Sequence, residues 1–595
     1  MIVPLVVAVP LGMAAAIAIF GRWLPEFAVD AAGIGTAVAG SVLAGILVSR
    51  TATRTIVYWF GGWQPHRHQF PLGIAFAVDR VGASLACLAF VLTAAVLLFS
   101  WHYLEEKHYL FETLMLVFAA GMAGFALSGD LFNMFVFFEL MSVAAYALTA
   151  YKIEEETALQ AAFNFAVSNS VGSFLVVFGL ALVYGRTGSL NLAELSTRLA
   201  AHHDGLVVVA FTLIVCGFMV KAAIVPFHFW LADAYAAAPA PVCVLFAGVM
   251  SDLGLYAIAR VYWGTFAAPL GVFESHIRIV LLVLGAITAI VAGFMCVLQR
   301  HIKRLLAYST ISELGCVLIG VALLTGDGVG GAALTVLAHA FAKGALFLIG
   351  GILLIELHDI DELRLFGAGR GRPVLATVWL LGCLALASPP FLGTFSGHAT
   401  IEDAASKLHE HWVAPVMALA TILSTGALLR AGARVFLGWG TRDDPVLSKE
   451  PPESPGPRDH PRPSLMKGVA LALALSGLGV GAWTGLAAAA RTAGANFVDH
   501  GAYVSMVLSG KAAPHVPHLT WFAHGSSIAW AIVTLTGSFV WAVLGLYRAK
   551  LPGVAAFAAI TRPLKAVHSG HVGDYVAWLT FGTAIIGGVF ALTLR

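Results

Sequence analysis

The stretch Lys221–Asp233, KAAIVPFHFWLAD, constrains this chain most, because it places charge and a helix break inside an apolar run. That run, from about 206 to 238, is long enough to cross a bilayer. A lysine near the bilayer centre costs at least about 2.5–3.5 kcal/mol, and such residues usually mark a path for charge. Pro226 removes a helix hydrogen bond, and broken backbone at this depth is tolerated only where protein or trapped water satisfies it. Lys221, Pro226 and His228 therefore predict a hydrated ion site; the alternative is a snorkelling lysine at a helix end.

The composition indicates a multi-pass membrane protein with the lipid bilayer as its main surroundings, and we expect it in the inner (cytoplasmic) membrane. The 595 residues are 59% hydrophobic and only 11% charged, whereas a soluble domain carries roughly 25% charged residues. A net charge of +2 gives no reason to expect a nucleic-acid partner. The apolar first twenty residues lack a basic region before them and a clean cleavage site after them, so we expect a retained first span.

The sequence offers no cofactor, catalytic or metal site that we can identify. The six cysteines stand singly in apolar segments without C-x-x-C spacing, as small buried hydrophobic residues do. The glycine-rich GAGRGR at 367–372 lies between apolar spans and lacks the strand that a dinucleotide site needs. Any electron transfer is therefore expected on another polypeptide.

Apolar windows predict an all-α fold of about sixteen transmembrane helices. We expect N-terminal helices at 1–105, a first repeat at 106–265, a second at 266–440, a polar linker at 441–465 and C-terminal helices at 466–595. The linker is rich in Pro and charge, which is typical of a disordered loop. Within 51–73, an aromatic and polar stretch predicts an extracytoplasmic hairpin with Trp59 and Trp63 at the membrane interface.

Charge in the loops predicts the orientation. Loops after odd-numbered spans hold about 20 Lys and Arg residues, and the others with the C-terminus hold about 10, so odd loops are expected to be cytoplasmic. With sixteen spans, both termini are predicted to be extracytoplasmic.

Two spans, the seventh and the twelfth, are expected to be broken. Pro226 interrupts the seventh, and Pro389 and Pro390 interrupt the twelfth within SPPFLGTFSGH. Five spans separate the breaks, which fits a repeat of five helices. Because five is odd, the second copy is inverted in the membrane, as in many transporters. The sequence thus predicts inverted repeats of spans 4–8 and 9–13, with an ion site at each break.

Ionisable residues in neighbouring spans predict a path for charge. Glu139 is flanked by apolar residues and is expected to pair with Lys221, since an isolated buried charge is disfavoured; a static interhelical ion pair is the alternative. A single buried histidine is more often a satisfied polar group, but six consecutive or near-consecutive spans with such residues favour a relay. The further members of this set are Asp252, Glu313, His339, Lys343 and His398. Lys303 and Arg304 are ambiguous, because a helix start at the cytoplasmic face can carry basic residues.

Several of these stretches resemble one known family. FFELMS, KAAIVPFHFWLADA, APAPV, HIKRLLAYSTIS, HAFAKGALFLIGG and PPFLGTFSG are similar to segments of the proton-conducting antiporter family. Its members are the antiporter-like subunits of respiratory complex I, of membrane-bound hydrogenases and of Mrp-type sodium/proton antiporters. The resemblance covers about 70–440, and SGHVGDYVAWLTFG resembles the last span of the longer, subunit-5-like members.

The resemblance implies fourteen core helices, two inverted five-helix repeats and a central hydrophilic axis. It implies that Glu139 and Lys221 form the family's glutamate–lysine pair, that His339 and Lys343 lie on the axis, and that His398 lies at the exit side. Asp252 and His398 depart from the family pattern, which has lysine at the first position and lysine or glutamate at the second. The long lateral helix of the distal complex I subunit is expected to be absent.

We therefore expect a proton-translocating, antiporter-like subunit of a multisubunit complex that is complex I-like or hydrogenase-related. The alternatives are an Mrp-type Na⁺/H⁺ antiporter subunit, an ion-driven energy-coupling subunit of a non-redox complex, and an inactive scaffold. The partners expected are other membrane subunits and protons, or Na⁺ in the second case. Asp252 is expected to share Lys221 with Glu139 if the side chains lie within about 4–6 Å.

Overall fold

The computed structural model describes residues 2–52, 54–63, 73–101, 108–202, 204–448, 463–511, 518–550, 559, 561 and 568–594. Among these residues, thirteen helical stretches are long and apolar enough to cross a membrane, so the chain is a multi-pass, mostly helical membrane protein. One of the thirteen, Ala240–Leu298, covers two expected spans, and the two broken spans contain the shorter apolar helices Gly205–Lys221 and Pro373–Leu386. The double stretch and the two broken spans account for the difference between thirteen stretches and sixteen predicted spans.

The elements of the first part run from the N-terminus to residue 273. They are α1 (Ile2–Phe20), η1 (Gly21–Trp23), α2 (Glu26–Arg50), β1 (Ile56–Trp59), η2 (Phe60–Gly62), β2 (Ala75–Val78), α3 (Arg80–Ser100), α4 (His108–Leu127), α5 (Leu131–Thr149), α6 (Glu156–Thr187), α7 (Leu192–Leu199), α8 (Gly205–Lys221), α9 (Phe229–Ala237), α10 (Ala240–Leu245), η3 (Phe246–Met250), α11 (Asp252–Val261), η4 (Tyr262–Phe266), α12 (Ala267–Leu270) and η5 (Gly271–Phe273).

The remaining elements form the second part and the C-terminal helices. They are α13 (Glu274–Leu298), α14 (Ile302–Ala322), α15 (Gly326–Leu357), α16 (Pro373–Leu386), α17 (Phe395–Lys407), α18 (Val413–Gly432), η6 (Ala433–Leu437), α19 (Pro463–Ala482), α20 (Thr484–Val498), α21 (His500–Ser509), α22 (Gly525–Tyr547), η7 (Arg548–Lys550) and α24 (Val572–Thr593).

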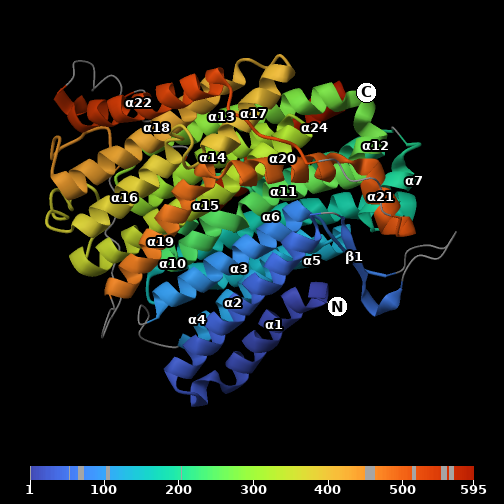
Figure 1. Ribbon diagram of the computed structural model, residues 1–595, viewed down its shortest axis with the longest axis horizontal. Helices are drawn as coiled ribbons and strands as arrows, with labels where there is room; N and C mark the ends of the chain where they lie inside the picture. The colour runs from blue at the N-terminus through green and yellow to red at the C-terminus, as the bar shows by residue number, and fades with distance from the viewer. Residues whose placement is uncertain are drawn as a thin grey trace.

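The helices lie side by side in one bundle (Figure 1). α1 and α2 lie at one edge, α18 and α22 lie at the opposite edge, and α14 and α15 lie between them. The apolar window of α14 is buried throughout, and that of α15 is 83% buried. Both termini lie at the end of the bundle that carries α7 and α12. Glu313 of α14 and His339 and Lys343 of α15 are therefore enclosed by protein.

A short β-hairpin departs from the all-α expectation. β1 pairs antiparallel with β2, from Ile56 opposite Val78 to Trp59 opposite Ala75, as the polar, aromatic stretch between two spans predicted. All four residues of β2 are buried, and the hairpin continues into a bridge between Phe76 and Ser128. Aromatic and β-branched residues outside the bilayer core favour this pairing. Trp59 is buried and Trp63 is exposed, and residues 64–72 lie outside the described part.

The start of the predicted linker packs against the bundle. Within 441–448, Asp444 and Val446 are buried, and the Ser448 amide donates to the Leu298 carbonyl oxygen at 2.9 Å. This segment is therefore not a disordered loop as expected, because contacts with buried charged residues compensate its polar composition. Residues 449–462 lie outside the described part, as do most of the residues between α22 and α24, where the long lateral helix was expected to be absent.

Candidate functional site

The first interruption separates α8, which ends at Lys221, from α9, which begins at Phe229. Pro226 lies between them. Ala223 there has φ of +51°, a conformation that costs a non-glycine residue about 1–2 kcal/mol. The Val225 amide, which no longer has a helical partner, donates to Thr288 Oγ1 of α13 at 3.1 Å. Neighbouring protein thus satisfies backbone that lipid could not.

Lys221 is fully buried at the end of α8. Its Nζ donates to Ser142 Oγ of α5 at 2.9 Å. The same atom lies 5.1 Å from the centre of the Phe138 ring and 5.7 Å from that of Phe165, within the range of cation–π attraction. The ammonium group therefore has one hydroxyl acceptor and two aromatic faces around it.

Glu139 lies one helical turn before Ser142 on α5 and interacts electrostatically with Lys221. The lysine, however, forms its hydrogen bond with Ser142 rather than with this carboxylate. Glu139 Oε1 is buried and has no hydrogen bond within the described residues. The expected pair is thus an electrostatic one, with Ser142 as the direct contact of the lysine.

The second interruption separates α16, which ends at Leu386, from α17, which begins at Phe395. Pro389 and Pro390 lie between them. Gly393 has φ of +58°, and a Cβ there would overlap the Ala385 carbonyl group, so the turn requires glycine. Its amide donates to the Leu478 carbonyl oxygen of α19 at 3.0 Å. This turn places His398 near the start of α17, inside the bundle.

His398 contacts another of the predicted residues directly. Its Nε2 lies 3.0 Å from Glu313 Oε1 of α14, and both side chains are less than 10% exposed. His339 and Lys343 of α15 interact electrostatically with Glu313. Lys343 Nζ also donates to the Leu306 carbonyl oxygen at 3.1 Å. The structure therefore brings together four predicted residues from three helices.

Asp252 faces this second group rather than Lys221. Its described interactions include Glu313 and not Lys221. Gly254 explains this, because a Cβ there would meet the Phe218 and Ala222 backbone of α8 within 3.0 Å. Two residues along a helix turn it by about 200°, so Asp252 points away from α8. The expectation that Asp252 shares Lys221 with Glu139 is therefore not met.

A cavity of about 150 Å³ borders Asp252. It lies between α3, α11, α15 and α20 and is mostly apolar, with Arg80 and Tyr256 also at its wall. Asp252 Oδ2 is buried and makes no hydrogen bond within the described residues. The cavity is larger than the roughly 10–15 Å³ of such volume that one water molecule needs, and Asp252 is an acidic group at its wall.

Three contacts near the first interruption were not predicted. His228 Nε2 lies 3.2 Å from Nε2 of His568, which comes from the segment before α24. Arg304, which was ambiguous in the sequence, pairs with Asp233 Oδ1 at 2.9 Å. Lys303 turns inward and donates to the Ala238 carbonyl oxygen at 2.9 Å. The nearest sequence signal was SGHVGDYVAWLTFG, which directly follows His568.

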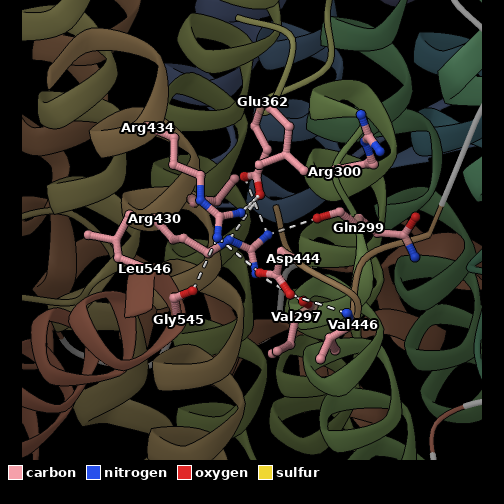
Figure 2. Close-up of polar contacts among 12 residues, drawn as sticks. Val297, Gln299, Arg300, Glu362, Arg430, Arg434, Asp444, Val446, Gly545 and Leu546 are labelled. Atoms are coloured by element: carbon pink, nitrogen blue, oxygen red, sulfur yellow. Dashed lines mark hydrogen bonds and ion pairs between the residues drawn. The ribbon is translucent and has the colours of Figure 1, made fainter. Parts of the chain in front are cut away.

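A buried cluster of charges, shown in Figure 2, ties loops of the second half together. Glu362 Oε1 accepts from Arg434 at 2.5 Å, and it forms an ion pair with Arg430 Nε at 3.2 Å. Asp444 Oδ2 accepts from Arg434 and Arg548, each at 2.9 Å. We call these five residues the arginine cluster.

The arginine cluster also anchors the backbone around it. Arg430 donates to the carbonyl oxygens of Val297 and Gln299 at 2.9 and 2.8 Å, and Arg548 donates to that of Val297 at 3.0 Å. One cluster thus joins the end of α13, the segment after α15, residues 441–448 and the end of α22. The arginine cluster therefore stabilises the packing of these segments against one another.

Comparison with known proteins gives three concordant results. Residues 128–424 match a family model described as "NADH:quinone oxidoreductase/Mrp antiporter, TM". The chain is 30% identical to a Na(+)/H(+) antiporter subunit of Bacillus subtilis (strain 168), over 73% of this chain and 85% of that protein. It is 33% identical to an NADH-quinone oxidoreductase subunit of Desulforudis audaxviator (strain MP104C), over 66% and 78% respectively.

A solved structure shows the same fold. One chain of the Mrp complex from Dietzia sp. DQ12-45-1b superposes with a TM-score of 0.73 at 26% identity, covering 85% of this chain and 99% of that chain. The region matched by the family model contains all eight ionisable residues predicted from the sequence and both helix interruptions, whereas His568 lies outside it.

Proposed function

Because the chain belongs to the family of NADH:quinone oxidoreductase and Mrp antiporter membrane subunits, we propose that it translocates protons across a membrane. It is an antiporter-like membrane protein related to subunits of multisubunit complexes. Its partners are accordingly other membrane subunits. The proposal assigns proton movement to this chain and any redox chemistry to those partners.

The observation that carries the proposal is the placement of buried ionisable groups beside two helix interruptions. Lys221, with Glu139 and Ser142, lies at the first interruption. His398, with Glu313, lies at the second. A group that is buried, ionisable and hydrogen-bonded can take up and release a proton when its neighbours change charge.

We infer a path that runs from His228 and Lys221 through the middle of the bundle to His398. Asp252, His339 and Lys343 provide the intermediate groups, since each interacts electrostatically with Glu313. Bound water would complete the steps between side chains. Glu139 would lower the free-energy cost of keeping the positive charge of Lys221 in the membrane.

The proposed topology has sixteen spans in the inner membrane, with inverted repeats of spans 4–8 and 9–13. The two interruptions support it, because they fall five spans apart and each lies beside a buried ionisable group. Both termini are proposed to be extracytoplasmic. Their position at the same end of the bundle supports an even number of spans (Figure 1), and the excess of Lys and Arg in the odd loops supports the orientation.

A second candidate is a subunit of an Mrp-type Na⁺/H⁺ antiporter. The 30% identity to the Bacillus subtilis antiporter subunit, over 85% of that protein, favours it. This candidate keeps the proton path in the chain and replaces a redox partner by the exchange of Na⁺.

Purification of the intact complex tests both candidates. The chain, tagged at a terminus and expressed from its own locus, is isolated in mild detergent and its partners are identified by mass spectrometry. The purified complex is then reconstituted into vesicles, and internal pH is followed under an imposed membrane potential. Redox subunits together with proton flux support the first candidate, and small antiporter subunits with Na⁺-dependent flux support the second. A complex that carries no proton flux in either assay contradicts the proposal.

A further inference from the structure

We propose that His568 exchanges protons between water and His228, and so forms the water-facing end of the proton path at the first interruption. This inference rests on the proposed proton translocation. It adds a residue from the C-terminal segment, about 340 positions from His228 in sequence, to a path whose other members lie within residues 128–424.

The two imidazole rings form a direct link between a buried and a partly exposed position. Nε2 of His228 and Nε2 of His568 lie 3.2 Å apart, and the ring planes are inclined by 76°. His228 is 2% exposed, whereas His568 is only partly buried. Since both atoms are Nε2, one ring donates a proton and the other accepts it. A bond of this kind is a path for a proton.

The residues that follow His568 in sequence are polar and lie at the protein surface. Ser569, His571 and Asp574, which follow it, are all exposed. Arg304 of α14, which interacts electrostatically with Tyr575 of α24, has a side chain that is 30% exposed. Exposed residues of this type are expected in water rather than in contact with lipid tails.

Aromatic and charged groups fix the two histidines. The Phe229 ring contacts the His568 ring at 4.8 Å and stacks on Tyr575 at 5.6 Å. Tyr575 Oη in turn donates to Asp233 Oδ2 at 2.5 Å, and Asp233 pairs with Arg304. The groups that surround the pair are thus Asp233 of α9, Arg304 and Tyr308 of α14, and Tyr575 of α24.

α24 holds this arrangement against the interruption itself. At Gly582, a Cβ would meet the Pro226 ring and the Phe227 ring of the segment between α8 and α9. The absence of a side chain therefore lets α24 lie directly on the broken helix. His568, a few residues before α24, is placed by this contact beside His228.

Packing contacts also connect the segment of His228 with Lys221. The Trp230 indole donates to the Val220 carbonyl oxygen at 3.0 Å and stacks on the Phe165 ring at 4.3 Å. The same Phe165 ring lies 5.7 Å from Lys221 Nζ. His228 and Lys221 therefore belong to one packed unit, in which His228 lies on the side of His568.

The proposed step moves one proton and leaves both rings neutral. Water protonates Nδ1 of His568, and the resulting imidazolium gives its Nε2 proton to Nε2 of His228. His228 then releases its Nδ1 proton inward to water. Rotation of both rings, or exchange of the proton between the two nitrogen atoms of each ring through water, restores the starting tautomers without returning the transferred proton. Histidine suits this step because the ordinary pKa of an imidazole lies close to neutral pH.

The test measures proton flux in vesicles that contain the full-length chain in its complex. The variants are His568→Ala, which removes the ring, and His568→Gln, which keeps a side chain able to hydrogen bond to His228 but unable to relay a proton. His571→Gln is the matched control, since it changes an exposed histidine three residues away. Lys221→Ala reports on the proposed function. Each assay is repeated with added imidazole.

We expect His568→Gln and His568→Ala to lose flux by about tenfold or more, and His571→Gln to retain it. Imidazole should restore flux in His568→Ala. If the ring had only a structural role, added imidazole would not restore flux. Unmutated flux in His568→Gln, or a loss in His568→Ala that imidazole does not restore, overturns the inference. If Lys221→Ala abolishes flux while His568→Gln retains it, only this inference fails. If Lys221→Ala retains flux, the proposed function fails as well.

Discussion

At the scale of single residues, the contact between Glu313 and His398 joins two residues that the sequence predicted for the ion path. A hydrogen bond of 3.0 Å joins them, and both are buried. The sequence placed both residues in the ion path, but it did not pair them, because 85 positions separate them. Only the fold of α17 against α14 brings them together.

This pair predicts strongly non-additive effects. We expect Glu313→Gln and His398→Gln each to lower proton flux by about 10²-fold, because each leaves its partner without the group that exchanges its proton. The double variant should be no slower than the slower single variant, since both remove one shared step. Flux measured in vesicles for all four proteins tests this. Effects that multiply would show that the two residues act separately.

Asp252 should be coupled to Glu313 and independent of Ser142. The reason is that Asp252 interacts with Glu313 and points away from α8. We expect the effect of Asp252→Asn on flux to change when Glu313→Gln is also present. Its effect should be the same with and without Ser142→Ala. Coupling energies from two double-mutant cycles measure this. Coupling to Ser142 alone would place Asp252 beside Lys221, contrary to the structure.

At the scale of elements, the interrupted helices depend on neighbours that supply hydrogen bonds. Pro226, Pro389 and Pro390 predict where the helices break, since proline cannot continue the backbone pattern. The residues that satisfy the freed backbone, Thr288 and Leu478, could not be predicted, because they lie on other helices. Local chemistry thus determines the interruption, and tertiary packing determines its support.

Thr288 provides a test of that support. Thr288→Val keeps the shape of the side chain but removes the hydroxyl that accepts from the Val225 amide. A buried amide without a partner costs about 1–3 kcal/mol, so the midpoint of thermal unfolding in detergent should fall. Thr288→Ser, which retains the hydroxyl, should stay nearer to the unmutated value. Equal midpoints for both variants would contradict this role.

The arginine cluster predicts a large loss of stability on removal of one carboxylate. Glu362→Gln should cost about 3–5 kcal/mol, because it leaves buried guanidinium groups without a counter-charge. The control is Glu356→Gln, whose partners Arg372 and Lys467 are partly exposed; this change should cost about 1 kcal/mol or less. Thermal unfolding of the two variants compares them. Equal losses would mean that burial of the cluster has no energetic consequence.

The pH dependence of the cluster can be predicted from Asp444, which lies outside the membrane spans. Burial alone would raise the pKa of Asp444, but the guanidinium groups of Arg548 and Arg434 outweigh it, and the pKa is lowered from 3.8. A lowered pKa stabilises the folded state above the unfolded value, and this contribution is lost as pH falls through the folded pKa.

The stability difference between the unmutated chain and Asp444→Asn should therefore be constant from about pH 7 to about pH 5 and shrink only below 3.8. Unfolding midpoints measured across this range test the sign. A difference that already shrinks above about pH 5 would contradict it.

At the scale of the whole molecule, the sequence predicted the class and the family more completely than the contacts. Apolar windows and the motifs around Glu139 and Lys221 indicate a many-helix, antiporter-like protein, as the comparisons show. The arginine cluster was missed because Arg430 and Arg434 resemble ordinary loop-facing charges at the end of a span. Their partners Glu362 and Asp444 lie in separate loops, and one sequence does not show which loops meet.

The ion carried by the whole chain is predicted to be H⁺ rather than Na⁺. Sodium needs several oxygen ligands, whereas the inferred path is dominated by Lys and His, whose nitrogen atoms do not supply them. Flux in vesicles should therefore be the same with Na⁺ or with K⁺ as the main cation. Flux that requires Na⁺ and is lost in Asp252→Asn or Glu313→Gln would contradict this prediction.

The central claim is that Lys221, buried beside the first interruption, carries protons through this chain. The most direct measurement compares proton flux in vesicles that contain the complex with unmutated chain, with Lys221→Ala, or with the exposed control Lys511→Ala, after assembly of each complex has been checked. We expect Lys221→Ala to abolish flux and Lys511→Ala to leave it unchanged. Flux near the unmutated level in an assembled Lys221→Ala complex would contradict the claim.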